Sequence, residues 1–382
     1  MSEPPGTSAH NEPPALRFRV VERGELSDPD IARMLELLAL AFDRWPLFDP
    51  GVPAEDHLRW KMSSPAGLVS AVLGEAGDEL VTTDTCVGYR ILLRGRPGLR
   101  LQFVDHAVRP SWRGQGVSSA SLAFRQRTLA ARYDLAISDV QSPLMIHRTR
   151  KFDSRPFGNP VLPLVLPLNL RDFARRWAAG RGLPGWAGAP LLAALALRPR
   201  RRPWGRSRGA GHRAVGFGLY EVERFDDGID GFFSAASAPW ELIVVRSREH
   251  LDWRYSDPRG GRFDKWVARD DGGTILGYAV ASVRGERGRL ADVLALPERL
   301  DVVSCLVAEL VAALERAGCV EVLCWLPRRH PYREVLRRAG FLDARREPSI
   351  TYRPCGTPAE ELAFLDAPEA RVHFTLGDTD LV

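Results

Sequence analysis

A glycine-containing turn in the first half of the chain carries the clearest signal for chemistry. The stretch V-R-P-S-W-R-G-Q-G-V-S, residues 108–118, joins the end of a strand-like segment to a helical one. The start of a helix presents unpaired backbone N–H groups and a partial positive charge, which together favour an anion. Gly114 and Gly116 would let this backbone approach a pyrophosphate closely. The turn therefore predicts a phosphate site, and a helix start without a ligand is the alternative interpretation.

Three residues around this turn have side chains that can exchange protons. Asp105 and His106 precede it in the same strand, and His147 follows it in S-P-L-M-I-H-R-T-R-K-F. Carboxylate and imidazole groups are the usual general acids and bases. Successive strand residues face opposite sides of a sheet, so only one of Asp105 and His106 can face a given site from the strand. All three are candidates for proton transfer, and a structural role is the alternative for each.

A repeated stretch indicates that the chain contains two copies of one unit. Residues 55–61 read E-D-H-L-R-W-K, and residues 248–254 read R-E-H-L-D-W-R. Aligned on this element, each half has the order strand, helix, helix, three strands, helix, strand, helix, which is a mixed α/β domain of about 150 residues. The shared His and Trp lie on one helix face, so we expect them to be structural, with acceptor binding in one copy as the alternative.

The two halves differ where the glycine turn falls. Residues 113–118 read R-G-Q-G-V-S, whereas residues 299–304 read R-L-D-V-V-S and contain no glycine. The second half therefore lacks the predicted phosphate-binding turn. We expect a disordered tail at 1–15, a first domain at 16–180, a linker at 181–213, a second domain at 214–355 and a C-terminal tail at 356–382.

Arg113-Gly114-Gln115-Gly116-Val117-Ser118 resembles the acyl-CoA signature R-x-x-G-x-G/A of the GNAT superfamily of N-acyltransferases, with Ser118 in place of Gly or Ala. The order of elements in residues 16–170 and 214–353 is similar to that of the family as well, so the chain resembles a tandem GNAT protein. The resemblance implies that acetyl-CoA or another acyl-CoA is the co-substrate, and that the second domain shapes the acceptor site. Residues implied to hold the CoA are Val108, Arg113, Gly114, Gln115, Gly116, Val117 and Ser118, with Val108 offering an N–H to the thioester oxygen.

The resemblance also ranks the proton-transfer candidates. The family often places a proton-donating Tyr five residues before a conserved Phe, and counting back from Phe152 gives His147, whereas the second half has Leu336 there. Asp105 recurs as Asp292, which favours a structural role, whereas His106 occurs in the first half alone. The family also has an Asn seven residues before the position of this Tyr. That position is Val140 here, so the contact that the Asn would make is not expected. Asp105, His106 and a water chain without a dedicated base all remain candidates for the base.

Composition limits the alternatives. Five cysteines without a C-x-x-C pair, and histidines without ligand spacing, argue against a metal site and fit a reducing cytoplasm. No run of 18 apolar residues and no signal peptide is visible, so we expect no membrane association. Residues 198–213 hold seven arginines and no acid, so this segment accounts for the net charge of +5, and without it the chain would have a net charge of −2. It reads as a solvated linker or as a docking site for an acidic partner.

Two apolar segments remain, at 161–170 and 183–197. They read as a strand and an interdomain helix, or as an acyl-chain channel or an interface with an acidic acyl-carrier protein whose phosphopantetheine carries the acyl group. We therefore expect an N-acyltransferase acting on a primary amine of a small molecule or peptide, in natural-product or polysaccharide biosynthesis. A non-catalytic acyl-CoA-binding module is the alternative. Nucleic-acid binding through the arginine-rich segment is a weaker third interpretation.

Overall fold

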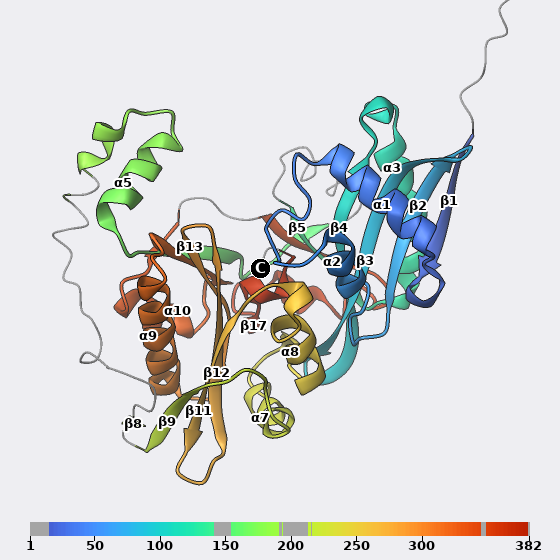
Figure 1. The fold of residues 1–382 in the computed structure, drawn as a ribbon. Coiled ribbons are helices and arrows are strands. Elements are labelled where there is room, and N and C mark those ends of the chain that lie inside the picture. Colours follow the sequence, from blue (N-terminus) through green and yellow to red (C-terminus); the bar gives the residue numbers. More distant parts are fainter. Residues whose placement is uncertain are drawn as a thin grey trace, which may run out of the picture.

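The alternating run at residues 16–22 forms the edge strand of the first of two sheets (Figure 1). The computed structural model describes residues 15–140, 154–190, 193, 213–214, 216–344 and 349–380. His147 lies outside these residues, as does most of the arginine-rich segment. The first sheet has the order β1-β2-β3-β4-β5-β16-β6. Along this order the strands are β1 (Leu16–Glu22), β2 (Val69–Ala76), β3 (Glu79–Leu93), β4 (Arg96–Val108), β5 (Leu135–Val140), β16 (Ser349–Pro354) and β6 (Arg155–Pro156), and the sheet also includes β10 (Leu242–Val244), which pairs with β3, and β17 (Val372–His373).

Helices cover both faces of the first sheet because its strands alternate apolar residues on the two sides. α1 (Asp28–Ala41) begins at Ser27, whose side chain accepts a hydrogen bond from the Asp30 N–H. Its buried residues pack with Ala71 and Leu73 of β2 and with α2 (Ala54–Lys61). α3 (Val117–Leu129) lies on the opposite face of the sheet, where Leu129 packs in a cluster with Val72 of β2.

The second sheet repeats the first in the order β15-β7-β14-β13-β12-β11-β9-β8. Its long helix, α9 (Leu300–Arg316), packs its apolar face on β12 and β13. Its strands are β15 (Leu342–Asp343), β7 (Val161–Pro167), β14 (Glu321–Pro327), β13 (Arg287–Ala295), β12 (Ile275–Arg284), β11 (Asp264–Asp270), β9 (Phe217–Glu221) and β8 (Arg213–Ala214). Its other helices are α7 (Gly228–Ala236), α8 (Arg248–Tyr255) and α10 (Tyr332–Arg338).

The two domains exchange strands. β7 pairs along its whole length with β14 of the second sheet, while β16 pairs with β5 of the first. The expected ranges 16–180 and 214–355 therefore do not each contain a complete sheet. The apolar run at 161–170 forms β7 and leads into α5 (Leu170–Ala179), which agrees with its reading as a strand. It is apolar on both faces because it lies between β14 and β15, inside the second sheet.

The repeated His-x-x-Trp elements meet across the interface between the domains. Trp60 on α2 and Trp253 on α8 stack with ring centroids 5.1 Å apart. Each indole N–H donates to the other residue's backbone carbonyl, at 2.8 Å for Trp60 and 3.1 Å for Trp253. His57 contacts the Arg259 carbonyl through Nδ1 at 2.7 Å, and burial lowers the pKa of His57 to about 4. The repeat thus forms a reciprocal, structural contact.

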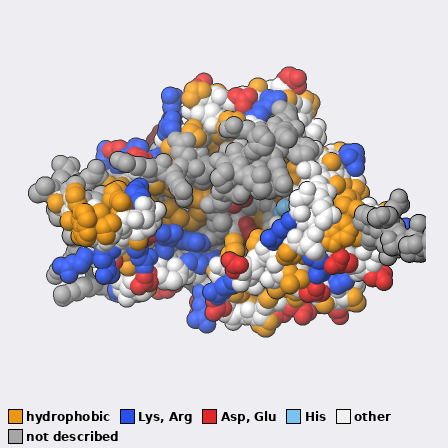
Figure 2. All heavy atoms as spheres, turned by 90° about the horizontal axis from the view of Figure 1, so that it is seen from above, with side chains coloured by type: hydrophobic (Ala, Val, Ile, Leu, Met, Phe, Trp, Pro, Cys, Tyr) orange, Lys and Arg blue, Asp and Glu red, His pale blue; other side chains and the backbone are white. Residues whose placement is uncertain are grey.

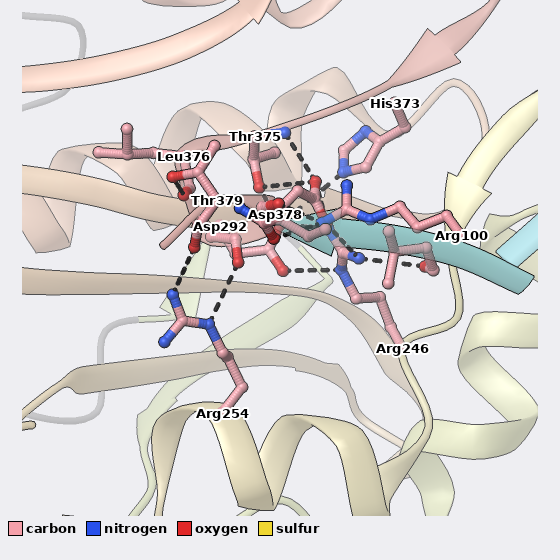
Figure 3. Close-up of polar contacts among 12 residues, drawn as sticks. Arg100, Arg246, Arg254, Asp292, His373, Thr375, Leu376, Asp378 and Thr379 are labelled. Atoms are coloured by element: carbon pink, nitrogen blue, oxygen red, sulfur yellow. Dashed lines mark hydrogen bonds and ion pairs between the residues drawn. The ribbon is translucent and has the colours of Figure 1, made fainter. Parts of the chain in front are cut away.

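The end of the described chain is not a free tail, which differs from the expectation for 356–382. β17 (Val372–His373) pairs with β10 (Leu242–Val244), and residues 372–379 are buried between the two domains (Figure 3). The Arg246 guanidinium contacts the carboxylates of both Asp292 and Asp378 at 2.8 Å. Arg254 donates to the Thr379 carbonyl at 2.8 Å. The sequence of this segment contains polar residues that are typical of a solvated tail. In the structure these residues bind polar groups of distant elements instead.

Candidate functional site: a strand gap that ends at a glycine turn

β4 and β5 separate inside the first sheet. These parallel strands pair only at Arg100–Leu135 and Leu101–Ala136. Beyond that point β5 continues beside β16, while β4 runs on to Val108. Throughout the described residues no further pairing joins the two strands, so the β5-facing backbone groups of β4 beyond Leu101 have no partner from β5.

A β-bulge lies in β4 beside this gap. Thr83 pairs with Ala107 and Thr85 with Val104, so Asp105 and His106 together face Asp84. Asp105 has a φ of 54°, in the left-handed region that a non-glycine residue seldom adopts. Bulges redirect side chains and often lie next to active sites. Here the bulge sends the Asp105 side chain toward α2 and the His106 side chain toward α3.

The glycine turn leads from the end of β4 into α3. Gly114 and Gly116 both have a φ of +82°, and no atom lies within 4 Å of the position of a Cβ on either. Gly116 is the N-cap of α3, which begins at Val117. The Arg113 side chain anchors the turn by donating to the Ala41 carbonyl at 3.0 Å. The turn therefore presents an open helix start, as its sequence predicts, with room for an anion.

His106 connects the strand to this helix start. Its Nε2 lies 2.8 Å from Ser118 Oγ, and its Nδ1 lies 2.7 Å from a carboxylate oxygen of Asp84. Asp84 is buried and also accepts from Arg125 at 2.6 Å. Burial alone would raise the pKa of Asp84, but Arg125 and His106 lower it to about 2. The ionised Asp84 therefore holds His106, which in turn holds the first turn of α3.

Asp105 takes part in a buried ion cluster. One of its oxygens accepts from the Trp45 indole at 2.8 Å, and the other lies 2.8 Å from Lys61 Nζ. Lys61 also contacts Asp380 at 2.9 Å. Burial would lower the pKa of Lys61, but the two carboxylates raise it well above its usual range. Asp292, the counterpart of Asp105, is likewise bound to a buried cation, Arg246.

Asp139 of β5 is a site residue that the sequence reasoning missed. The Gln102 side-chain amide of β4 donates to its carboxylate at 3.3 Å, so this pair spans the beginning of the gap. Burial and the nearby Asp380 carboxylate raise the pKa of Asp139 to about 7. A single acid in the apolar strand LAISDV is the signal that could have indicated it.

Of the predicted site residues, the structure places those at 105–118 around the end of β4. His147 falls outside the described residues, and so does the side chain of Val140. In the second domain, a cavity of about 490 Å³ lies at the corresponding strand end, lined by Leu296, Leu300 and Tyr332 among others. The described residues contain no cluster of metal-ligating side chains and no helix long and apolar enough to span a membrane.

Solved structures share this fold, although no protein-family model and no curated protein matches the chain. A conserved protein from Enterococcus faecalis V583, described as a probable N-acyltransferase, matches with a TM-score of 0.58 and 12% identity, covering 89% of this chain and 72% of its own. The Saccharomyces cerevisiae N-myristoyltransferase with bound myristoyl-CoA matches with a TM-score of 0.56 and 12% identity, covering 93% and 87%. A tandem GNAT protein from the clavulanic acid biosynthesis pathway matches with a TM-score of 0.54 and 15% identity, covering 90% and 99%.

These likenesses define the class of fold. The chain has the GNAT fold twice in tandem, with a mixed sheet in each domain, as the repeat and the glycine turn predicted. At identities of 9–15% they carry no assignment of substrate or of individual catalytic residues to this chain.

Proposed function

We propose that the first domain transfers an acetyl or longer acyl group from a CoA thioester to a primary amine. The observation that carries the proposal is the gap between β4 and β5, which leads to an open glycine turn at the start of α3. A strand-like pantetheine arm fits such a gap, and a pyrophosphate fits the helix start. The solved relatives include a protein with bound myristoyl-CoA, which supports an acyl-CoA as the donor.

The binding residues are those around the turn. Backbone N–H groups of Arg113, Gly114, Gln115, Gly116, Val117 and Ser118 would hold the pyrophosphate. The unpaired edge of β4 near Val108 would offer an N–H to the thioester oxygen and stabilise the oxyanion of the tetrahedral intermediate. His106 is then a positioning residue, because its contacts fix Ser118 and the helix start.

Asp139 is our proposed general base. Its pKa of about 7 suits the removal of a proton from an ammonium group at neutral pH. The amine nitrogen then attacks the thioester carbon, a C–N bond forms, and the C–S bond breaks. The nitrogen gives its second proton to water or to His147, and the departing thiolate takes a proton from the same source, so that an amide and a free thiol result. Asp105 is less suited to this step, because Trp45 and Lys61 occupy both of its oxygens.

The proposal is tested by measuring thiol release from acetyl-CoA and longer acyl-CoAs with a panel of primary amines, and by identifying the N-acyl product by mass spectrometry. An acyl-carrier protein that carries the same acyl group tests the other donor. Amine-dependent thiol release with an N-acylated product is the expected result. Acyl-CoA binding without transfer to any amine would instead support a non-catalytic binding module.

A further inference from the structure

A groove lies between the two domains. It has a volume of about 310 Å³ and is lined by residues 48–51 of the first domain and by residues 261–263 and 283–284 of the second. Seen from above, Lys and Arg side chains gather on the second domain where the two lobes meet (Figure 2). The wall that the second domain gives to the groove includes Val283 and Arg284 at the end of the β12–β13 hairpin, which also carries Arg287 and Arg289.

The register of the hairpin places these arginines on one face. Arg284 pairs with Arg287, and Ser282 pairs with Arg289, and residues directly opposite in an antiparallel pair share a face. The intervening residues face α9 instead: a Cβ on Gly288 would meet the Leu314 side chain. The arginine face is therefore the face turned away from α9, and its member Arg284 lines the groove.

The arginines on this face differ in their partners. Arg287 forms an ion pair with Glu321 of the neighbouring strand at 2.5 Å. Arg284 and Arg289 contact no carboxylate within the described residues, and Arg289 Nε and Ser282 Oγ are buried there without a hydrogen-bond partner. Burial and neighbouring arginines lower the pKa of Arg284 to about 8. Both arginines are half-buried, so an anion that contacts their guanidinium groups would form charge-assisted hydrogen bonds in partly desolvated surroundings.

A single loop connects the arginines to the proposed transfer site. The chain between α1 and α2 carries Trp45, which donates to Asp105, and Phe48, whose ring lies under the Arg284 guanidinium. The charge of the Asp380 carboxylate acts on both Asp139 and Arg284, so these groups belong to one region, with the proposed base on the first domain and the arginines on the second. A molecule with an amine at one end and an anion at the other matches this polarity.

We propose that the acceptor amine carries a carboxylate or a phosphate, and that Arg284 and Arg289 of the second domain bind this anionic group. The inference rests on the proposed function and names the substrate class of the same site. The second domain then contributes to specificity, because its arginines orient an acceptor whose amine reaches the first domain. Charge-assisted pairs with guanidinium groups give both the affinity and the orientation.

The test compares acceptor pairs that differ only in the anionic group, namely amino acids against their carboxamides and amino-sugar phosphates against the unphosphorylated amino sugars. We expect kcat/KM to be at least about tenfold higher for one charged member of these pairs, as loss of a charge-assisted contact of about 1.4 kcal/mol implies. Arg284→Gln and Arg289→Gln should remove this preference, so that the ratio of kcat/KM for the charged and neutral members falls toward one. The preferred pair distinguishes a carboxylate from a phosphate.

Arg338→Gln is the matched control, because it removes the same charge from an exposed ion pair on α10. Equal use of charged and neutral amines, or an unchanged preference in both variants, would overturn the inference and leave the proposed function intact. Absence of transfer to every amine would overturn the proposed function itself. Binding of inorganic phosphate to the CoA-saturated protein, lost in Arg284→Gln, would then still support an anion site, and no such binding would contradict it.

Discussion

At the scale of single residues, two carboxylates that are close in space differ in what they can do. Asp105 is held by Lys61 and Trp45, whereas the partners of the Asp139 carboxyl are the Gln102 amide and its own backbone N–H, and its pKa is elevated. The environment of each group, and not its residue type, therefore favours one of them as the base. The sequence singled out Asp105 because it lies near the turn and missed Asp139, whose surroundings depend on the exchanged strand β16.

Asp139→Asn should remove the pH dependence that the base imposes. In the native protein kcat/KM should rise about tenfold per pH unit up to a pH of about 7, since only the ionised carboxylate accepts a proton. The variant should be slower and lack this limb. A pH profile of amine-dependent thiol release measures it, and an identical limb in the variant would contradict the role of Asp139.

Although Asp139→Asn should slow the reaction, it should stabilise the fold. A carboxyl whose folded pKa is raised binds more protons when folded than when unfolded, so its contribution destabilises the fold as pH rises from about 4 to about 7. Asp139→Asn should therefore raise the melting temperature more at pH 8 than at pH 4. Thermal unfolding at both pH values provides the measurement, and a loss of stability at pH 8 would be inconsistent with it.

Lys61→Met tests the buried ion cluster. The substitution leaves the Asp105 and Asp380 carboxylates buried without their cation. We expect it to destabilise the fold by about 3–5 kcal/mol, as is typical when one partner of a buried pair is removed. Arg59→Met, which removes the exposed ion pairs with Asp28 and Glu55 from the same helix, should have a much smaller effect. Chemical denaturation measures both values, and equal effects would argue against the cluster.

At the scale of elements, the start of α3 depends on contacts with distant residues that the local sequence does not predict. The glycine turn and its helix were predictable, because Gly114 and Gly116 have positive φ and follow a strand. The bulge at Asp105 and the link from Asp84 through His106 to Ser118 were not, because they depend on the register between β3 and β4. Ser118 departs from the GNAT pattern, and His106 supplies its partner.

His106→Phe should weaken acyl-CoA binding more than it slows the chemical step. Loss of the His106 contact frees Ser118 and lets the first turn of α3 move. We expect KM for acyl-CoA to rise about five- to tenfold with kcat nearly unchanged, as loss of a positioning hydrogen bond implies. Steady-state kinetics at saturating amine separates the two constants. A fall in kcat alone, without a change in KM, would point to direct proton transfer by His106.

At the scale of the whole molecule, the repeat determines how the two domains are joined. Each domain gives the other a strand, β7 or β16, and the Trp60 and Trp253 elements bond to each other. The duplication and the tandem fold were visible in the sequence. The exchange of strands and the burial of residues 372–379 were not, because pairing partners more than 150 residues apart leave no local pattern.

The central claim is that the gap and the glycine turn of the first domain bind an acyl-CoA for transfer to an amine. Gly116 and Gly273 have φ values of +82° and +84° and equally open surroundings, so Val substitutions impose a similar backbone strain at both positions. Gly273 lies in the β11–β12 turn, away from the gap. Equilibrium binding of acetyl-CoA and amine-dependent thiol release should both fall at least about tenfold in Gly116→Val and stay unchanged in Gly273→Val. Unaltered acetyl-CoA binding in a folded Gly116→Val protein would contradict the account.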